Sequence, residues 1–201
     1  MTEAVLNAAD PNVASMANKT KGAVTFFAQD RHHPVMATHR AQGHAVVYVE
    51  EGNLVAAKGD FKHHIPLSKI PVTLGGAIGF QVENVMAAVA AVWATGLDWD
   101  AVRSGLASFV ADTGNAPGRF NLMEFGGATV IADYGHNPDA MLALVQAVGA
   151  MPAQRRSVVI SGAGDRRDED IREQTRTLGD AFDQIVLFED ACQRGRADGE
   201  V

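Results

Sequence analysis

The sequence predicts an α/β protein that ends in a parallel β-α-β-α-β unit. After residue 127, three short apolar runs alternate with two stretches of helical pattern. Strands that are apolar throughout and alternate with helices are typical of a parallel sheet covered by helices. A cluster of breaker residues, Gly-Asn-Ala-Pro-Gly at 114–118, precedes this unit and indicates a domain boundary. We therefore expect two domains, residues 1–116 and residues 117–201.

The elements of the first domain follow from turn and periodicity signals. Residues 51–53 (Glu-Gly-Asn) lie between two apolar runs, which indicates a hairpin. Apolar residues at helical spacing from Val82 onward predict an amphipathic helix that ends at Gly96, and Asp98 then caps a second helix. The predicted strands are residues 5–7, 24–27, 45–50 and 54–57, with a short helix within 11–20 and extended segments at 65–67 and 70–72.

The second domain contains the alternating unit. Pro138 stands at the first position of a helix, and Asn137 before it is a good N-cap. Right-handed crossovers would place the carboxyl ends of all its strands at one edge of the sheet. The predicted elements are strands at 128–132, 157–160 and 185–188, and helices at 138–148 and 170–182.

The composition limits the partners and the compartment. The chain has 17 Lys+Arg against 24 Asp+Glu, a formal net charge of −7, and this argues against nucleic acid as a partner. The single cysteine, Cys192, excludes an internal disulfide and suits a reducing compartment. No apolar run approaches the roughly 20 residues of a membrane span. We expect a soluble, cytoplasmic protein without a membrane partner, and the sequence leaves the oligomeric state open, a homo-oligomer included.

Two polar loops follow the first two strands of the second domain. One begins at Asp133 and contains His136 and Asn137; the other covers residues 161–168 and contains Arg166 and Arg167. Ligands of parallel sheets bind outside the carboxyl ends of the strands, so these loops predict a site. A carboxylate such as Asp133 can accept hydrogen bonds from ribose, and a helix N-terminus favours phosphate.

Each of these residues also has a structural interpretation. Asn137 caps the following helix with or without a ligand, and His136 fits either a binding or a structural role. Arg166 and Arg167 suit a bound anion through bidentate hydrogen bonds, and equally a surface pair neutralised by neighbouring acids. The chain contains no phosphate loop of the Gly-Lys-Thr type, and its histidine pairs lack the spacing of metal ligands, so no metal site is predicted.

A linked series of motifs resembles the Mur ligase superfamily, and within it the cyanophycin synthetase branch. The series is Gly-Phe-Gln-Val-Glu-Asn at 79–84, Pro-Gly-Arg-Phe-Asn at 117–121, Asp-Tyr-Gly-His-Asn-Pro at 133–138 and Ser-Gly-Ala-Gly-Asp-Arg-Arg-Asp at 161–168. The resemblance covers nearly the whole chain. It implies that residues 1–116 are the later part of a central ATPase domain, and that residues 117–201 begin a Rossmann-like C-terminal domain.

The resemblance also implies an activity and roles for residues. The family activates a carboxylate with ATP and Mg²⁺ as an acyl phosphate, which an amine then attacks. In the cyanophycin branch, arginine is joined to the side-chain carboxylates of a polyaspartate (cyanophycin) primer. Arg119 would reach the ATP phosphates, and Asp133 would hold the ribose, with His136 and Asn137 near the nucleotide. The residues implied for the adenine are Gln81 and Asn84.

Alternatives and departures accompany this resemblance. A peptidoglycan Mur ligase, a folylpolyglutamate synthase relative and a non-catalytic nucleotide-binding module are the alternative functions. Ala9 stands where the family pattern Asn-Ala-Asp-Asp-Pro has an acid. The family carries its phosphate loop and metal ligands upstream of the segment that matches this chain. We therefore expect residues 1–201 to be a fragment that does not hydrolyse ATP alone, with the ligands of Mg²⁺ outside it.

Overall fold

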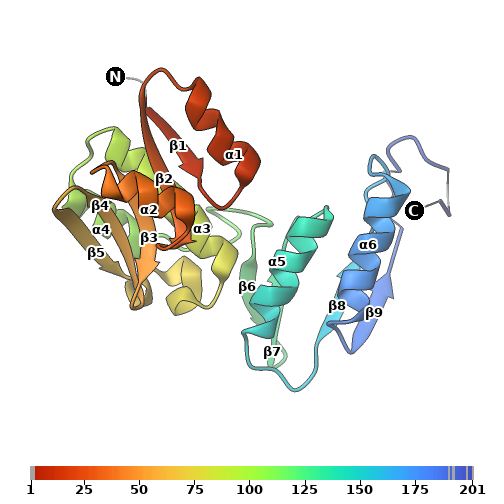
Figure 1. The fold of residues 1–201 in the computed structure, drawn as a ribbon. Helices are drawn as coiled ribbons and strands as arrows, with labels where there is room; N and C mark the ends of the chain where they lie inside the picture. Colours follow the sequence, from red (N-terminus) through yellow and green to blue (C-terminus); the bar gives the residue numbers. More distant parts are fainter. Residues whose placement is uncertain (1–2, 190, 192, 198, 201) are drawn as a thin grey trace. The chain divides into compact units, whose positions relative to one another are not determined.

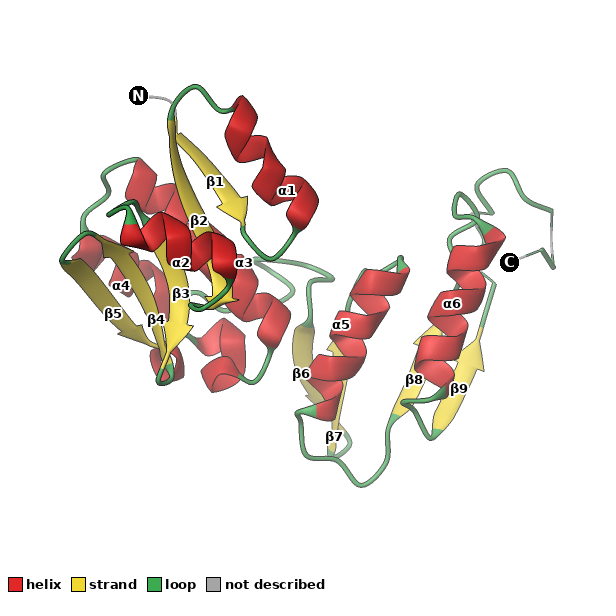
Figure 2. Cartoon of the chain, in the orientation of Figure 1, coloured by secondary structure: helices red, strands yellow, loops and turns green. Residues whose placement is uncertain are grey.

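The computed structural model describes residues 3–189, 191, 193–197 and 199–200, so Cys192 lies outside the described residues. The chain divides into two compact units, Met1–Val110 and Ala111–Val201. The predicted α/β class is confirmed, because both units combine helices with strands that pair in parallel (Figures 1 and 2). Across the described residues, no helix is long and apolar enough to cross a membrane.

The first unit is built on one mixed five-stranded sheet in the order β1-β2-β3-β4-β5, drawn from red to olive in Figure 1. β1, β2 and β3 pair in parallel, and β4 and β5 continue the sheet as antiparallel strands. The elements are β1 (Glu3–Asn7), α1 (Pro11–Ser15), β2 (Ala23–Asp30), α2 (Pro34–Ala41), β3 (Val46–Glu50), β4 (Asn53–Lys58), β5 (Phe61–Pro66), α3 (Gly79–Ala94) and α4 (Trp99–Ser108), with short 3₁₀ helices at Met16–Lys19, Leu67–Lys69 and Pro71–Gly76.

Helices cover both faces of this sheet because its strands are apolar on both sides. In β3, Val47 contributes to the cluster beneath α3, whereas its neighbours Val46 and Tyr48 belong to the cluster beneath α2. This alternation follows from the two-residue period of a strand. The predicted stripe of α3 is confirmed, since Val82 and Met86 are buried. The unit therefore has two apolar layers, one on each side of a single sheet.

The turns of the first unit largely follow the sequence signals. The predicted hairpin connects β3 and β4 through Glu51 and Gly52, whose φ angles of 49° and 73° suit a tight turn with left-handed residues. Asp98 caps α4 by accepting a hydrogen bond from the Asp100 amide at 2.9 Å. Residues 70–72 were expected to be extended, but Pro71 begins a 3₁₀ helix. Proline is compatible with the first turn of a helix because it lacks only an amide that such a turn leaves unpaired.

The second unit contains two two-stranded sheets. β8 and β9 pair in parallel, whereas β7 pairs antiparallel with β6, a strand that the sequence analysis missed. The missed signal is Gly126-Gly127, a hairpin turn with φ angles of 59° and 79°. The elements are β6 (Asn121–Phe125), β7 (Ala128–Ala132), α5 (Pro138–Gly149), β8 (Ser157–Ile160), α6 (Asp168–Gly179) and β9 (Gln184–Leu187).

The expected alternation of strands and helices is therefore present, but no pairing joins β7 to β8 among the described residues. A groove of about 530 Å³ is lined by β7, α5 and β8. Val159 of β8 is 65% exposed, in contrast to Val46 and Val47 of the central strand β3, which are fully buried. Within the described residues, the parallel pairing predicted for the second unit is thus present between β8 and β9 and absent between β7 and β8.

A histidine connects α4 to the edge strand β5 in the first unit. The Arg103 guanidinium donates a hydrogen bond to His63 Nδ1 at 3.1 Å, and the His63 ring stacks on Trp99 with centroids 4.1 Å apart. Since arginine has no acceptor, His63 accepts this bond in its neutral form. Desolvation by burial, and then the charge of Arg103, lower the pKa of His63.

We expect this contact to be lost in acid. A lowered folded-state pKa means that the stabilisation is complete above the unfolded-state pKa of about 6.5 and is lost as the pH falls below it. Between about pH 7.5 and about pH 5.5, the wild-type melting temperature should therefore fall further than that of His63→Gln. Thermal melts of both proteins at the two pH values test this; parallel decreases would show that His63 titrates without coupling to folding.

Candidate functional site

The candidate site of the second unit lies in the loops that follow β7 and β8. Asn137 caps α5, because its Oδ1 accepts a hydrogen bond from the Ala140 amide at 2.8 Å, and Pro138 follows as the first helical residue. The structural interpretation of these two residues therefore accounts for their local contacts. A binding role for Asn137 stays a prediction.

Asp133 connects the loop after β7 to the segment that precedes β6. Its Oδ2 accepts a hydrogen bond from the Phe120 amide at 2.9 Å, and its Oδ1 accepts one from the Gly135 amide at 2.6 Å. Phe120 has a φ of 53°, so its backbone leaves regular structure at this contact. Asp133 thus fixes two irregular segments while its side chain remains exposed to solvent.

The segment around Arg119 is held from both sides. The Gly118 amide donates to Asn121 Oδ1 at 2.6 Å, and the Gly118 carbonyl accepts from the Tyr134 amide at 2.8 Å. Asn121 is 1% exposed and also donates to the carbonyls of Ala111 and Ala116. These bonds place the Arg119 guanidinium over the Tyr134 ring, 5.8 Å from its centroid, which is cation–π geometry.

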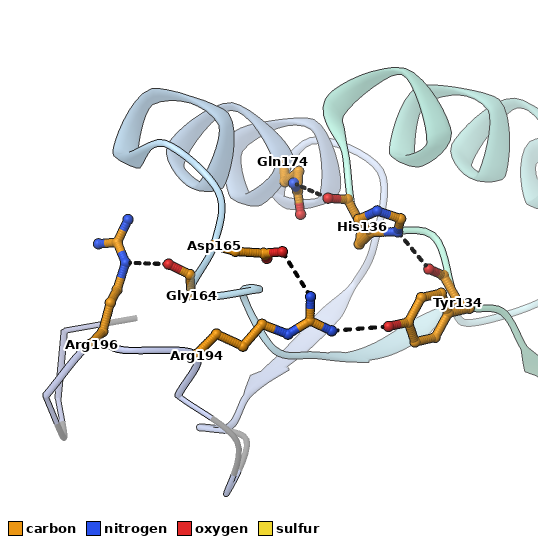
Figure 3. A network of polar contacts seen from close by, with 7 residues as sticks. All are labelled: Tyr134, His136, Gly164, Asp165, Gln174, Arg194 and Arg196. Atoms are coloured by element: carbon orange, nitrogen blue, oxygen red, sulfur yellow. Dashed lines mark hydrogen bonds and ion pairs between the residues drawn. The ribbon is translucent and has the colours of Figure 1, made fainter.

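His136 is also held by its neighbours. Its Nδ1 lies 3.1 Å from the Tyr134 carbonyl, and its own carbonyl accepts a hydrogen bond from Gln174 Nε2 of α6 at 3.1 Å (Figure 3). Gln174 is 3% exposed, so this bond joins the loop after β7 to the interior side of α6. No local sequence signal pointed to Gln174, which lies on the helix predicted only as a covering element.

The two predicted anion-binding arginines have different surroundings. Arg167 makes a bidentate ion pair with Asp170 in the first turn of α6, with contacts of 2.7 and 3.0 Å. In Arg166, Nε is buried and has no hydrogen-bond partner among the described residues. The first turn of α6 also carries Asp168 and Glu169, whose negative charges oppose an anion there. The assignment of both arginines to substrate stays a prediction, with Arg166 the better placed of the two.

Two arginines that the sequence analysis did not single out enter this region. Arg194 binds Asp165 at 2.8 Å and Tyr134 Oη at 3.0 Å (Figure 3). Arg196 binds the Gly164 carbonyl at 2.8 Å. The pKa of Asp165 is lowered, first by its hydrogen bond with Arg194. The loops after β7 and β8, expected at one edge, are therefore joined through Arg194.

In the first unit, the predicted adenine-binding pair lies at an apolar groove. Gln81 and Asn84 stand in the first two turns of α3, and Asn84 Nδ2 donates to Gln81 Oε1 at 3.2 Å. The groove has a volume of about 430 Å³ and is lined otherwise by apolar residues of α3 and α4, with Val72, Leu97 and Phe109. An apolar slot with a few amide groups suits a flat heterocycle.

No group of three or more metal-ligating side chains occurs within the described part of the chain. Chemically, the second unit offers a guanidinium on an aromatic ring beside a carboxylate, whereas the first offers an apolar groove with two amides. A guanidinium can bind an anionic group, and an apolar groove with amide groups can bind a flat ring.

Comparison with known proteins finds a family and several relatives that this chain resembles. Residues 118–200 match the family described as "Mur ligase, glutamate ligase domain". The chain is 39% identical to the cyanophycin synthetase of a Synechocystis species over 98% of its own length, and spans 23% of that protein. It is 30% identical to the UDP-N-acetylmuramyl-tripeptide synthetase of Deinococcus radiodurans over 94% of its length, and spans 36% of that protein.

A solved structure gives the same fold. Escherichia coli FolC in complex with ADP matches 88% of this chain with 43% of its own, at a TM-score of 0.54 and 22% identity. The resemblance of the chain to the Mur ligase superfamily is thus confirmed, with the glutamate ligase domain of that family at residues 118–200 and matches of 36–39% identity in the cyanophycin synthetases.

Proposed function

We propose that this chain is part of an ATP-dependent amide ligase that acts through an acyl phosphate, and that it adds arginine to the side-chain carboxylates of polyaspartate. The observation that carries the proposal is the 39% identity with a cyanophycin synthetase over 98% of the chain. The lower identity of 30% to the tripeptide synthetase makes a peptidoglycan ligase the second candidate, ahead of a folate ligase or a non-catalytic nucleotide-binding module.

In the proposed reaction, a carboxylate oxygen of the primer attacks the γ-phosphorus of ATP, and ADP leaves. The α-amine of arginine then attacks the carbonyl carbon of the acyl phosphate, loses a proton, and phosphate leaves. Gln81 and Asn84 would bind the adenine, and Asp133 the ribose, with His136 and Asn137 nearby. Arg166 and Arg167 would bind the anionic substrate. The ligands of Mg²⁺ are proposed to lie outside residues 1–201.

Arg119 is the residue that we assign to the transferring phosphate. It is exposed, its guanidinium lies over the Tyr134 ring, and its side chain makes no hydrogen bond or ion pair with another described residue. Its five N–H donors are therefore available to phosphate oxygens, to which an arginine can bind in bidentate fashion. Because the segments on both sides are tied down, the guanidinium is preorganised for a charge that grows in the transition state.

We expect Arg119→Ala in the complete protein to lower kcat by ~10²-fold or more with little change in melting temperature, as loss of a transition-state contact does. Arg176→Ala, which removes an exposed arginine in the last turn of α6 with no side-chain hydrogen bond to another described residue, is the control for loss of charge. Steady-state rates of arginine incorporation provide the measurement. A kcat within about threefold of wild type would refute the assignment.

Asp133→Ala should have two separable effects. Loss of two hydrogen bonds to a charged acceptor should lower the free energy of unfolding by about 1–3 kcal/mol. Loss of the ribose contact should raise the Kd for ATP by roughly tenfold to a hundredfold in the complete protein. Urea unfolding and calorimetric titration measure the two quantities.

Asp180→Ala, which removes an exposed acid with no side-chain hydrogen bond recorded among the described residues, is the matched control. Destabilisation of Asp133→Ala with unchanged ATP affinity would leave Asp133 a structural residue only. Affinity for arginine should change much less than affinity for ATP, because the ribose contact does not involve the amino-acid substrate.

The 201-residue chain should not hydrolyse ATP by itself. It contains no Gly-Lys-Thr phosphate loop, and such a loop supplies the backbone amides and the lysine that hold the β- and γ-phosphates. Phosphate release measured with purified protein, ATP and Mg²⁺ should equal the rate without protein. Turnover that depends on both Mg²⁺ and the chain would show that these residues hold the phosphates in another way.

A further inference from the structure

Residues 193–196 form a strap against the loop that follows β8. The contact depends on glycine at 164, because a Cβ on Gly164 would overlap the backbone carbonyl of Gln193. No conformational demand on Gly164 itself explains the glycine, since its φ is not in the left-handed region. The missing side chain is thus what allows the strap to lie against the loop.

Arg196 fastens the strap. Its guanidinium donates to the Gly164 carbonyl at 2.8 Å, to the Arg166 carbonyl at 2.6 Å and to Asp168 Oδ1 at 2.7 Å. The two bonds to carbonyls are partly buried, and bonds from a charged donor are stronger than those between neutral groups. The same side chain therefore holds three points of the loop, which fixes the backbone that carries Arg194.

Arg194 reaches from the strap to the other loop. One of its terminal nitrogens binds Asp165 Oδ2 at 2.8 Å and the other donates to Tyr134 Oη at 3.0 Å (Figure 3). The pair with Asp165 is exposed, and exposed ion pairs contribute little stability. Its effect is geometric, since the planar fork of arginine can direct one nitrogen at each acceptor.

Tyr134 contacts both Arg194 and Arg119. The hydroxyl of Tyr134 is held by Arg194, and the face of its ring lies beneath the Arg119 guanidinium, 5.8 Å away. A mobile tyrosine would offer Arg119 a moving support, whereas a tyrosine held at its hydroxyl offers a fixed one. Holding a binding group in place before the ligand arrives reduces the entropy lost on binding.

We propose that Arg194 is a positioning residue: carried by the strap, it fixes the Tyr134 side chain and thereby the Arg119 guanidinium. This inference rests on the proposed function for its effect on catalysis, because there Arg119 binds the transferring phosphate. The contacts among the strap, Tyr134 and Arg119 do not depend on that function, so they are testable without activity.

The first test observes Tyr134 directly. 3-Fluorotyrosine is placed at position 134 of the complete protein by amber suppression, and its ¹⁹F resonance is recorded. We expect Gly164→Ala, which alters neither Tyr134 nor any charged side chain, to shift this resonance as Arg194→Ala does. Gly149→Ala, at a glycine of α5 with open space around it, should leave it unchanged. An unchanged resonance in Gly164→Ala and Arg194→Ala would overturn the proposal.

The second test is a double-mutant cycle on kcat in the complete protein. Arg194→Ala should lower kcat by about tenfold or more, as a small misplacement of a catalytic group does, and leave the KM for arginine within about twofold. In an Arg119→Ala background, the same change should alter kcat by less than about twofold, because the group it positions is gone. Equal effects in both backgrounds would contradict the positioning role.

Arg194→Lys distinguishes geometry from charge. Lysine keeps the positive charge but lacks the fork that bridges Asp165 and Tyr134, so we expect its kcat to resemble that of Arg194→Ala. Full activity of Arg194→Lys would overturn the positioning role. If the wild-type protein forms no amide product, the proposed function fails, and the ¹⁹F measurement still decides whether the strap holds Tyr134.

Discussion

The second unit depends on the carboxylate of Asp133, which accepts hydrogen bonds from the amides of Phe120 and Gly135. Both amides belong to irregular backbone, which has no ladder or helix to satisfy them. Because Arg119 directly precedes Phe120 and His136 directly follows Gly135, the same carboxylate sets the position of both. One charged side chain thus organises the backbone and stands at the place proposed for the ribose.

The arginines of the second unit differ in whether their side-chain donors are already bonded to other groups of the protein. Arg167 forms an ion pair with Asp170 of its own helix. The donors of the Arg196 guanidinium are occupied by carbonyls of the loop after β8. Arg194 links two loops, and the Arg119 side chain, within the described residues, contacts an aromatic ring and no hydrogen-bond acceptor. An arginine is available to a ligand only where no carboxylate or carbonyl has already taken its donors. By this criterion the Arg119 guanidinium is available to a ligand, and its place over the Tyr134 ring gives it a defined position.

Helix α3 serves two purposes with one apolar surface. Val85 and Val89 belong to the core beneath the sheet and also line the groove beside α4. A helix with so wide an apolar face is typically buried all round, and here part of that face remains open beside Gln81 and Asn84. The packing of α3 on the sheet and the shape of the groove are therefore coupled, because the same side chains belong to the core and line the groove.

The sequence by itself determined the α/β class, the hairpin at Gly52, the stripe from Val82 and the caps at Asp98 and Asn137. Each of these depends on local periodicity or on a turn residue, which act within a few positions of the chain. The motifs also indicated the family and placed Asp133 and Arg119 among the candidates.

The tertiary structure alone decided which groups meet. The bond from Gln174 to His136 and the bond from Arg194 of the strap to Tyr134 join residues that are 38 and 60 positions apart. No local signal encodes such contacts, because a polar side chain finds its partner only after the backbone has brought the two together. Which arginines keep donors available for a ligand is therefore decided by these tertiary contacts, and the candidate site depends on them.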